Sequence, residues 1–370
     1  MKDLKSLLFL ENTNHDWSGL HDSFEWIRNM QGCEQDSIHH AEGDVAVHTN
    51  MVVNELFKDQ KYKNLQRGLQ SQLYASALLH DVAKPITTIH EADGRITSAG
   101  HAKKGEYLAR TILMDLGVDF KSRERISKLV RYHGLPIWFL EKKDPLKAVI
   151  ECSLQVETDL LSILVEADMK GRICGDLENM LMQIELFKMF CQESGCWGHA
   201  KNFSSDHSRF TYFHKEDMHP DTKVYDDTKF EVTILCGIPG SGKDTWIKKN
   251  MPNVPSINLD DIRKELNIKP TAEQGLVIQT AKERSKEFMR SRKSFIWNGT
   301  NVTRQMRGQL IDLFSSYGGR IRIVYLNTPF QTILKQNNDR EAIVPERVLF
   351  KLRDKLEVPN LTECHELIIA

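Results

Sequence analysis

The chain has 370 residues, a length that predicts two or three domains, each large enough to bury a core of its own. Its 50 lysines and arginines nearly balance 51 aspartates and glutamates, which excludes a generally basic nucleic-acid coat and an acidic disordered tail, though not a local basic groove. Seven cysteines without a C-x-x-C pair, no signal-peptide pattern and apolar runs too short to span a bilayer predict a cytoplasmic protein with reduced thiols.

Helical patterns fill the first part of the chain. Apolar residues fall on one helical face over 65–79 and again over 154–169, and Pro85 and Pro136 follow such helices, where the chain must turn. The pattern dissolves between residues 196 and 229, where the sequence is polar, aromatic and aperiodic. We interpret this segment as a connector. A packed arm is the alternative, because the segment is rich in Trp and Phe for a free linker.

Short strand-like runs then alternate with helical stretches. The runs are residues 230–238, 294–299 and 320–327, and strand–helix alternation favours a parallel sheet covered by helices. The sequence therefore predicts a multidomain fold, which consists of an all-α domain at 1–200, a connector at 201–227 and an α/β domain at 228–370.

Histidines and aspartates recur at helix ends or inside helical patterns in the all-α part. Histidine nitrogens and carboxylate oxygens together suit first-row divalent metals such as Mn, Fe, Co, Ni or Zn. A carboxylate between two metals can bridge them, and a bimetallic centre would activate a water for phosphate displacement. Asp81 is the natural bridge. Any single histidine is more often a surface or packed residue, and among the 14 in the chain His39, His40 and His90 are expected bystanders. The candidate ligands are His48, the pair His80–Asp81, His101, His133 and Asp168.

The ordered set, with HD inside LLHDVAKP, then AGHAKKG and finally EADMKGR, resembles the HD phosphohydrolase superfamily over roughly the first half of the chain. The resemblance implies a helical, metal-dependent phosphatase or phosphodiesterase with one or two divalent transition metals. Lys84 would point at the substrate phosphate, with a solvated lysine as the alternative, and Arg172 would be either a phosphate contact or a structural salt bridge. The implied first metal site is His48, His80, Asp81 and Asp168, and the second is His101 and His133 with Asp81.

A phosphate-binding loop stands in the C-terminal part, in ILCGIPGSGKDTWIKK. The pattern G-x-x-x-x-G-K follows a strand and opens a helix, as this motif requires. Its glycines let backbone N–H groups converge on phosphate oxygens, and its lysine reaches the β- and γ-phosphates. The predicted nucleotide-binding residues are Gly237, Gly240, Ser241, Gly242, Lys243, Asp244 and Thr245.

Asp244 departs from this motif, because the residue after the lysine is usually a Ser or Thr whose hydroxyl binds Mg²⁺. A carboxylate beside a triphosphate is repulsive unless a metal lies between them or the side chain turns away. Loops similar to those of adenylate kinases also place Thr one position later, as Thr245 is here. We therefore expect Mg²⁺, bound with ATP or another NTP, to be held partly through water.

The segment SINLDDIRKEL supplies a candidate acceptor site. Asp260 would take the proton of an attacking hydroxyl and Arg263 would hold a phosphate of the acceptor; the alternative is that Asp260 or Asp261 only caps a helix. Further on, in NNDREAIVPE, Arg340 would close over the nucleotide and stabilise the transferred phosphoryl group, with Lys335 as the weaker candidate.

GIPGSGKDT, LDDIR, WNGTN and the NNDREAIVPE lid together resemble the 5′-hydroxyl polynucleotide kinase family over residues 228–370, with departures at Asp244 and near Asn298. Joined to an HD domain, the chain looks like the bacterial HD phosphatase–polynucleotide kinase fusions. That resemblance implies RNA repair: phosphorylation of 5′-OH ends by an NTP, and removal of 2′-, 3′- or 2′,3′-cyclic phosphates.

The implied partners are RNA or DNA ends, RNA being favoured, and a ligase that joins the healed ends, with no membrane involved. Two alternatives remain. One is a nucleotide-metabolism fusion of an HD nucleotidohydrolase with a small-molecule kinase. The other is a nucleotide-sensing regulator whose HD domain binds a signal without catalysis.

Overall fold

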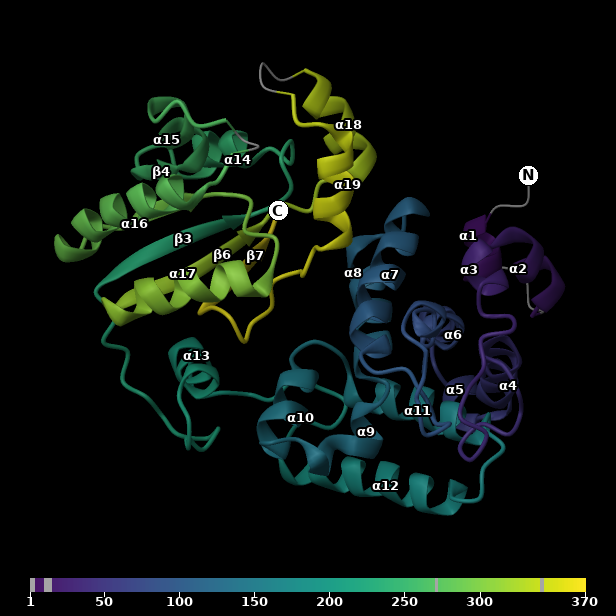
Figure 1. Cartoon of the computed structure of the whole chain (residues 1–370). Helices are drawn as coiled ribbons and strands as arrows, with labels where there is room; N and C mark the ends of the chain where they lie inside the picture. Colours follow the sequence, from purple (N-terminus) through teal and green to yellow (C-terminus); the bar gives the residue numbers. More distant parts are fainter. Residues whose placement is uncertain (1–3, 10–14, 270–271, 340–342) are drawn as a thin grey trace. The chain divides into compact units, whose positions relative to one another are not determined.

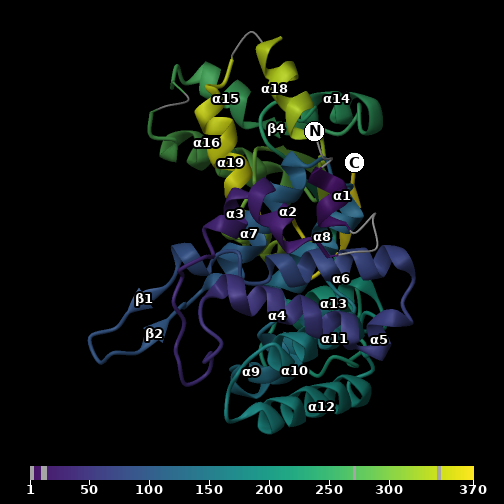
Figure 2. The ribbon, with the colours of Figure 1, turned by 90° about the vertical axis from the view of Figure 1, so that its right-hand side faces the viewer.

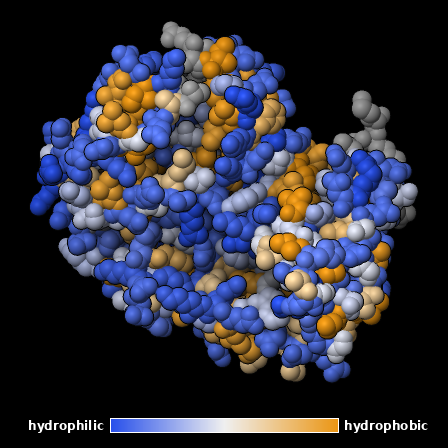
Figure 3. Space-filling model, in the orientation of Figure 1, coloured by the Kyte–Doolittle hydropathy of each residue, from blue (hydrophilic) through white to orange (hydrophobic). Residues whose placement is uncertain are grey.

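The computed structural model describes residues 4–9, 15–269, 272–339 and 343–370. The chain divides into two compact units, Met1–Asn202 and Phe203–Ala370 (Figure 1). Within the described ranges, no helix is both long and apolar enough to cross a membrane. On the face seen in Figure 3, hydrophobic residues form small separate groups among hydrophilic ones.

The N-terminal unit is a bundle of helices around an apolar core, as predicted. Side chains such as Val52, Leu78, Val130 and Leu164 are fully buried there, on helices α4, α6, α8 and α11 respectively. Figure 2 shows α4, α6 and α11 packed beside one another, with a small β1–β2 hairpin projecting from the bundle. The elements are α1 (Leu4–Leu8), α2 (Trp17–Ser23), α3 (Glu25–Arg28), α4 (Val45–Lys58), α5 (Gln60–Lys63), α6 (Arg67–Leu79), η1 (Lys84–Ile86), β1 (Ile89–His90), β2 (Ile96–Thr97), α7 (His101–Asp115), α8 (Phe120–Tyr132), α9 (Leu135–Trp138), η2 (Phe139–Glu141), α10 (Pro145–Ser153), α11 (Thr158–Lys170) and α12 (Leu177–Glu193).

Local sequence sets where these helices begin. Asp44 and Asp119 cap α4 and α8 by accepting hydrogen bonds from the backbone N–H groups three residues on. The helix expected over 154–169 starts later, at Thr158, because Leu154 ends α10 and a turn separates the two helices. The apolar pattern across that turn belongs to two helices that share one core.

The C-terminal unit contains a parallel sheet with helices, also as predicted. Among the described residues its strands lie in the order β4-β5-β3-β6-β7, and every neighbouring pair is parallel. The first expected strand ends at Cys236, because Gly237 already belongs to the following loop. The elements are α13 (Asp206–His214), β3 (Phe230–Cys236), α14 (Lys243–Asn250), β4 (Ser256–Asn258), α15 (Leu259–Glu265), α16 (Gly275–Arg290), β5 (Phe295–Asn298), α17 (Arg304–Ser316), β6 (Gly319–Tyr325), α18 (Phe330–Asn338), α19 (Glu346–Asp354) and β7 (Glu366–Ile369).

The segment interpreted as a connector, 201–227, contains helix α13. Arg209 on this helix donates to the carbonyl oxygens of Leu361 and His365, and Nδ1 of His207 lies 3.1 Å from Nε2 of His365. Phe210 stacks on the His365 ring with centroids 4.0 Å apart. Aromatic residues of the segment therefore pack beside strand β7, as the alternative of a packed arm predicts.

Candidate functional site

The helices of the N-terminal unit bring the six predicted metal ligands together. The ligand atoms of His48, His80 and Asp168 lie within 4.8 Å of one another, and so do those of Asp81, His101 and His133. All are buried except His101, whose side chain is 26% exposed and marks the side open to solvent. His48 comes from α4, His80 and Asp81 from the end of α6, His101 from the start of α7, His133 from the end of α8, and Asp168 from α11.

Backbone carbonyls fix the orientation of three histidines. Nδ1 of His80, of His101 and of His133 donates to the carbonyl oxygen three residues earlier, at 2.7, 2.8 and 2.7 Å. Their Nε2 lone pairs therefore face the centre, where His48 and His80 approach to 3.4 Å and His101 and His133 to 3.1 Å, Nε2 to Nε2. Lone pairs this close repel unless a proton or a metal cation lies between them. The donor set thus fits divalent metals of the first transition row.

Asp81 lies between the two histidine pairs. Its Oδ2 is 3.2 Å from Nε2 of His80 and 3.8 Å from Nε2 of His48. Its Oδ1 is 3.5 Å from Nε2 of His101 and 3.9 Å from that of His133. In the part of the chain that the structure describes, this buried Oδ1 has no hydrogen-bond partner. One oxygen therefore faces each pair, as a bridging ligand requires.

Two cations border this centre. Nζ of Lys84 lies 2.7 Å from Oδ2 of Asp81 and is buried rather than solvated. Burial alone would raise the pKa of Asp81, but Lys84 helps to hold it well below its ordinary value. Arg172 forms a salt bridge with Asp168 at 3.0 Å, and Asp168 Oδ1 lies 3.1 Å from Nε2 of His48. Arg172 and His48 hold the pKa of Asp168 well below normal despite its burial. Of the two alternatives for Arg172, a phosphate contact or a structural salt bridge, the structure shows the salt bridge.

Sequence reasoning missed Glu42 and set His40 aside as a bystander. Oε1 of Glu42 lies 2.9 Å from Nδ1 of His48 and 2.8 Å from Nδ1 of His40, and burial lowers the pKa of His40 to about 4. A carboxylate behind a ligating histidine fixes its tautomer and orientation. The irregular loop that carries Glu42 has no periodicity or motif that could have indicated this contact.

The phosphate-binding loop joins β3 to α14 in the C-terminal unit. Gly240 and Gly242 adopt φ of 86° and 87°, the left-handed region that favours glycine. A Cβ on Gly237 would lie 2.5 Å from Oγ of Ser241. Nζ of Lys243 donates to two carbonyl oxygens of the loop, at 2.8 and 3.1 Å. The lysine therefore lies over the loop, where the phosphates of a nucleotide would bind.

Asp244 turns toward the neighbouring strand. Its Oδ1 accepts a hydrogen bond of 2.6 Å from Nδ2 of Asn298, the last residue of β5. Thr245 follows with an exposed side chain. The sequence did not indicate this contact of Asn298, although it showed that Asp244 departs from the usual motif.

The candidate acceptor residues lie just after β4. Asn258 caps α15 by accepting from the backbone N–H of Asp260, so the alternative that Asp260 or Asp261 provides the cap is wrong. The Asp260 carboxylate pairs with the guanidinium of Arg263, whose Nε also donates to Oε1 of Gln274 at 2.7 Å. Because parallel strands end at one edge, this pair shares the carboxyl edge of the sheet with the phosphate-binding loop.

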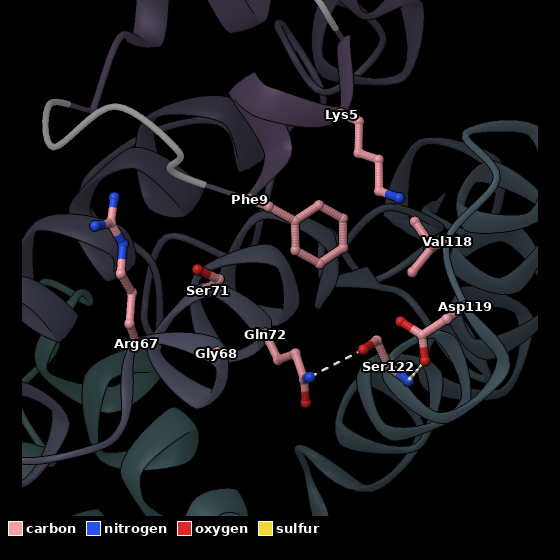
Figure 4. A pocket seen from close by; sticks show the side chains of 9 residues that line it. All are labelled: Lys5, Phe9, Arg67, Gly68, Ser71, Gln72, Val118, Asp119 and Ser122. Carbon is pink, nitrogen blue, oxygen red and sulfur yellow. Dashed lines mark hydrogen bonds between the residues drawn. The ribbon is translucent and has the colours of Figure 1, made fainter.

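The two residues expected to close over the nucleotide, Arg340 and Lys335, give no contact that could be described at this site. Arg340 lies outside the described residues, and Lys335 is exposed on α18. A cavity of about 340 Å³ lies elsewhere, in the N-terminal unit between the α1 region, α6 and the start of α8 (Figure 4). Phe9, Arg67, Gln72 and other residues line it, and none of the candidate metal ligands does.

Comparisons with known proteins match one family in the N-terminal unit and another in the C-terminal unit. Residues 55–152 match the model of the HD domain, and residues 232–359 match the model of an AAA domain. The chain joins an HD phosphohydrolase domain to a P-loop kinase-like domain. L-seryl-tRNA(Sec) kinase of Methanococcus maripaludis is 25% identical over 135 residues, 34% of this chain and 52% of that protein. The chain thus spans about half the length of this curated relative.

Two solved structures resemble the chain distantly. A candidate kinase of Chloroflexus aurantiacus is 12% identical, with a TM-score of 0.33, over 39% of this chain and 86% of its own. A gluconokinase of Sinorhizobium meliloti is 16% identical, with a TM-score of 0.29, over 38% of this chain and 82% of its own.

Proposed function

We propose that the protein heals broken nucleic-acid ends by adding a phosphate to a 5′-OH and removing a phosphate from the opposite end. The observation that carries the proposal is the presence, in one chain, of a complete His/Asp centre and a phosphate-binding loop whose sheet edge also holds the Asp260–Arg263 pair. Ribonuclease-type cleavage leaves a 5′-OH and a 2′,3′-cyclic phosphate. A ligase needs the opposite arrangement, so both chemistries act on one substrate.

The HD unit would hydrolyse 2′-, 3′- or 2′,3′-cyclic phosphates. His48, His80, Asp81 and Asp168 would hold one divalent metal, and Asp81 would share its second oxygen with the His101 and His133 site. A metal bound there would supply an activated water and positive charge for the phosphate oxygens. Lys84, within hydrogen-bond distance of Asp81, would bind a phosphoryl oxygen. The partly exposed side of His101 would admit the substrate.

The kinase unit would transfer the γ-phosphate of ATP or another NTP, with Mg²⁺. Lys243 would leave the loop carbonyls for the β- and γ-phosphates. Asp260 would accept the proton of the 5′-OH, and Arg263 would exchange part of its contact with Asp260 for a phosphate of the acceptor. Asp244, held by Asn298, would order the water around Mg²⁺, while Arg340 would stabilise the transferring group.

RNA ends are the favoured substrate, and a ligase is the expected downstream partner. The curated relative is named as a kinase of L-seryl-tRNA(Sec), which supports an acceptor hydroxyl carried on RNA. That support concerns the substrate class only.

The test is an incubation with ATP, Mg²⁺, Mn²⁺ and a short RNA that carries a 5′-OH and a 2′,3′-cyclic phosphate. The expected products have a 5′-phosphate and free 3′-terminal hydroxyls, as mapped by mass spectrometry. Activity on mononucleotides alone would contradict the proposal and favour the nucleotide-metabolism fusion. A purified HD unit without metal or hydrolytic activity would instead favour the sensor.

A further inference from the structure

Gln35 reaches the HD centre from the irregular loop between α3 and α4. Its Oε1 accepts a hydrogen bond of 2.6 Å from Nζ of Lys84, which in turn lies 2.7 Å from Oδ2 of Asp81. Gln35 is 9% exposed and Lys84 7%. A single side chain, that of Lys84, therefore links this carboxamide to Asp81, the residue that faces both histidine pairs.

The orientation of this carboxamide is fixed by its neighbour. Lys84 offers only N–H donors, so the amide oxygen must face it and the amide nitrogen must point elsewhere. That nitrogen, Nε2, is fully buried and has no hydrogen-bond partner among the residues that the structure describes. An unpaired buried donor is unfavourable unless a bound group accepts from it.

The loop that carries Gln35 is tethered on both sides. The backbone N–H of Gly32 donates to Oδ2 of Asp44 at 2.7 Å, and that of Val45 donates to the carbonyl oxygen of Cys33 at 3.1 Å. Glu42, in the same loop, contacts His48. Gln35 is thus preorganised beside the centre rather than carried by a free segment.

We propose that Gln35 is a substrate-binding residue of the HD site, whose carboxamide N–H group donates to a phosphoryl oxygen of the bound phosphate ester. The proposal rests on the proposed phosphohydrolase function. Its chemistry is specific: Lys84 supplies positive charge and Gln35 a neutral donor, so together they bind adjacent oxygens of one phosphate. This contact with the phosphate requires no change in the protonation state of Gln35 and no further side chain.

The decisive variant is Gln35→Glu, which keeps an oxygen for Lys84 but replaces the N–H donor with a second acceptor. We expect inorganic phosphate to bind at least about tenfold more weakly, because a donor is lost and a carboxylate faces the anion. Binding is measured by calorimetry on the full chain loaded with Mn²⁺, in a Lys243→Ala background that disables the phosphate-binding loop. Gln31→Glu, an exposed position near the same loop, is the control for added charge and should bind phosphate normally.

The companion variant Gln35→Met removes both contacts and should also weaken phosphate binding. If Gln35→Glu binds phosphate within twofold of its parent while Gln35→Met does not, Gln35 only positions Lys84 and the proposal is overturned. Loss of bound Mn²⁺ in Gln35→Glu would overturn it as well. If the unmodified protein hydrolyses no phosphate ester, the proposed function itself fails; if it does and Gln35→Glu is unchanged, only this inference fails.

Discussion

Replacing Glu42 with glutamine is a sharp test of how the HD centre is built. Oε1 of Glu42 lies 2.9 Å from Nδ1 of His48 and 2.8 Å from that of His40, while Oε2 accepts from the backbone N–H of Ile173 at 2.9 Å. A carboxamide has only one acceptor oxygen. If that oxygen faces the histidines, the carboxamide N–H₂ group faces the backbone N–H of Ile173, so two donors oppose each other. If it faces Ile173, an N–H₂ group opposes His48 and favours the tautomer whose proton blocks Nε2.

Either arrangement weakens His48 as a metal ligand. Changes behind a metal ligand lower metal affinity by about 10–100-fold. That range equals about 1.4–2.7 kcal/mol of binding free energy. We therefore expect Glu42→Gln to weaken Mn²⁺ binding 10–100-fold at one site and to leave the kinase active.

The measurement is a competition titration of Mn²⁺ into metal-free protein. Glu55→Gln is the matched control, because Glu55 lies on the same helix as His48 but pairs with Lys58 at the surface. Equal Mn²⁺ affinity in Glu42→Gln and Glu55→Gln would refute the idea that Glu42 orients His48.

Three other outcomes are expected. Asp81→Ala should abolish removal of terminal phosphate and leave 5′-phosphorylation nearly intact, as assayed on one RNA; equal loss of both would mean that the sites are not separable. Lys243→Ala should lose NTP binding, whereas Asp260→Asn should keep it and lose about 10²–10⁴ in transfer rate, as titration and kinetics would show. Burial raises the pKa of Glu106, but cations such as Lys128 lower it to about 2. Its carboxylate therefore stabilises the fold above its ordinary pKa of 4.5, and this stability is lost as pH falls toward 2; urea unfolding of Glu106→Gln should show a weaker acid dependence.

The alternation of patterns was enough to predict the fold class but not every element. The strands β3 and β5 were recognisable because nearly all of their residues are buried, and most of these residues are apolar. Strand β6 was recognisable because Arg320 and Arg322, which are partly exposed, alternate with buried apolar residues. Strand β7 was missed because it has only four residues at the sheet edge, of which three are partly buried and Ile369 is exposed. Its pairing with β6, from Arg322–Glu366 to Tyr325–Ile369, depends on contacts far apart in sequence.

The metal ligands were predictable for a different reason. Their order along the chain and the short motifs around them, such as LLHDVAKP and EADMKGR, can be recognised without knowing how the helices pack. Glu42 and Gln35 belong to a loop whose contacts with His48 and Lys84 arise only after the helices pack. The sequence marked Asp244 as a departure, but its partner Asn298 lies 54 positions away, and only the parallel pairing of strands brings them together.

Buried polar atoms without partners carry information that motifs lack. A folded chain pairs nearly all such atoms, so each exception calls for a ligand, strain or another physical cause. Oδ1 of Asp81, Nε2 of Gln35 and Nδ1 of His48 lie at the HD centre, and Oγ of Ser241 lies in the phosphate-binding loop. None of these atoms forms a hydrogen bond within the described residues, although Nδ1 of His48 lies 2.9 Å from Oε1 of Glu42. Oδ1 of Asp81 and Nε2 of Gln35 have opposite needs, because a carboxylate oxygen requires a cation or a hydrogen-bond donor and a carboxamide nitrogen requires an acceptor. A metal and a phosphate bound together would satisfy both atoms, whereas a metal alone would leave Gln35 unpaired. The unpaired donor is therefore the observation on which the proposed contact between Gln35 and a phosphate depends.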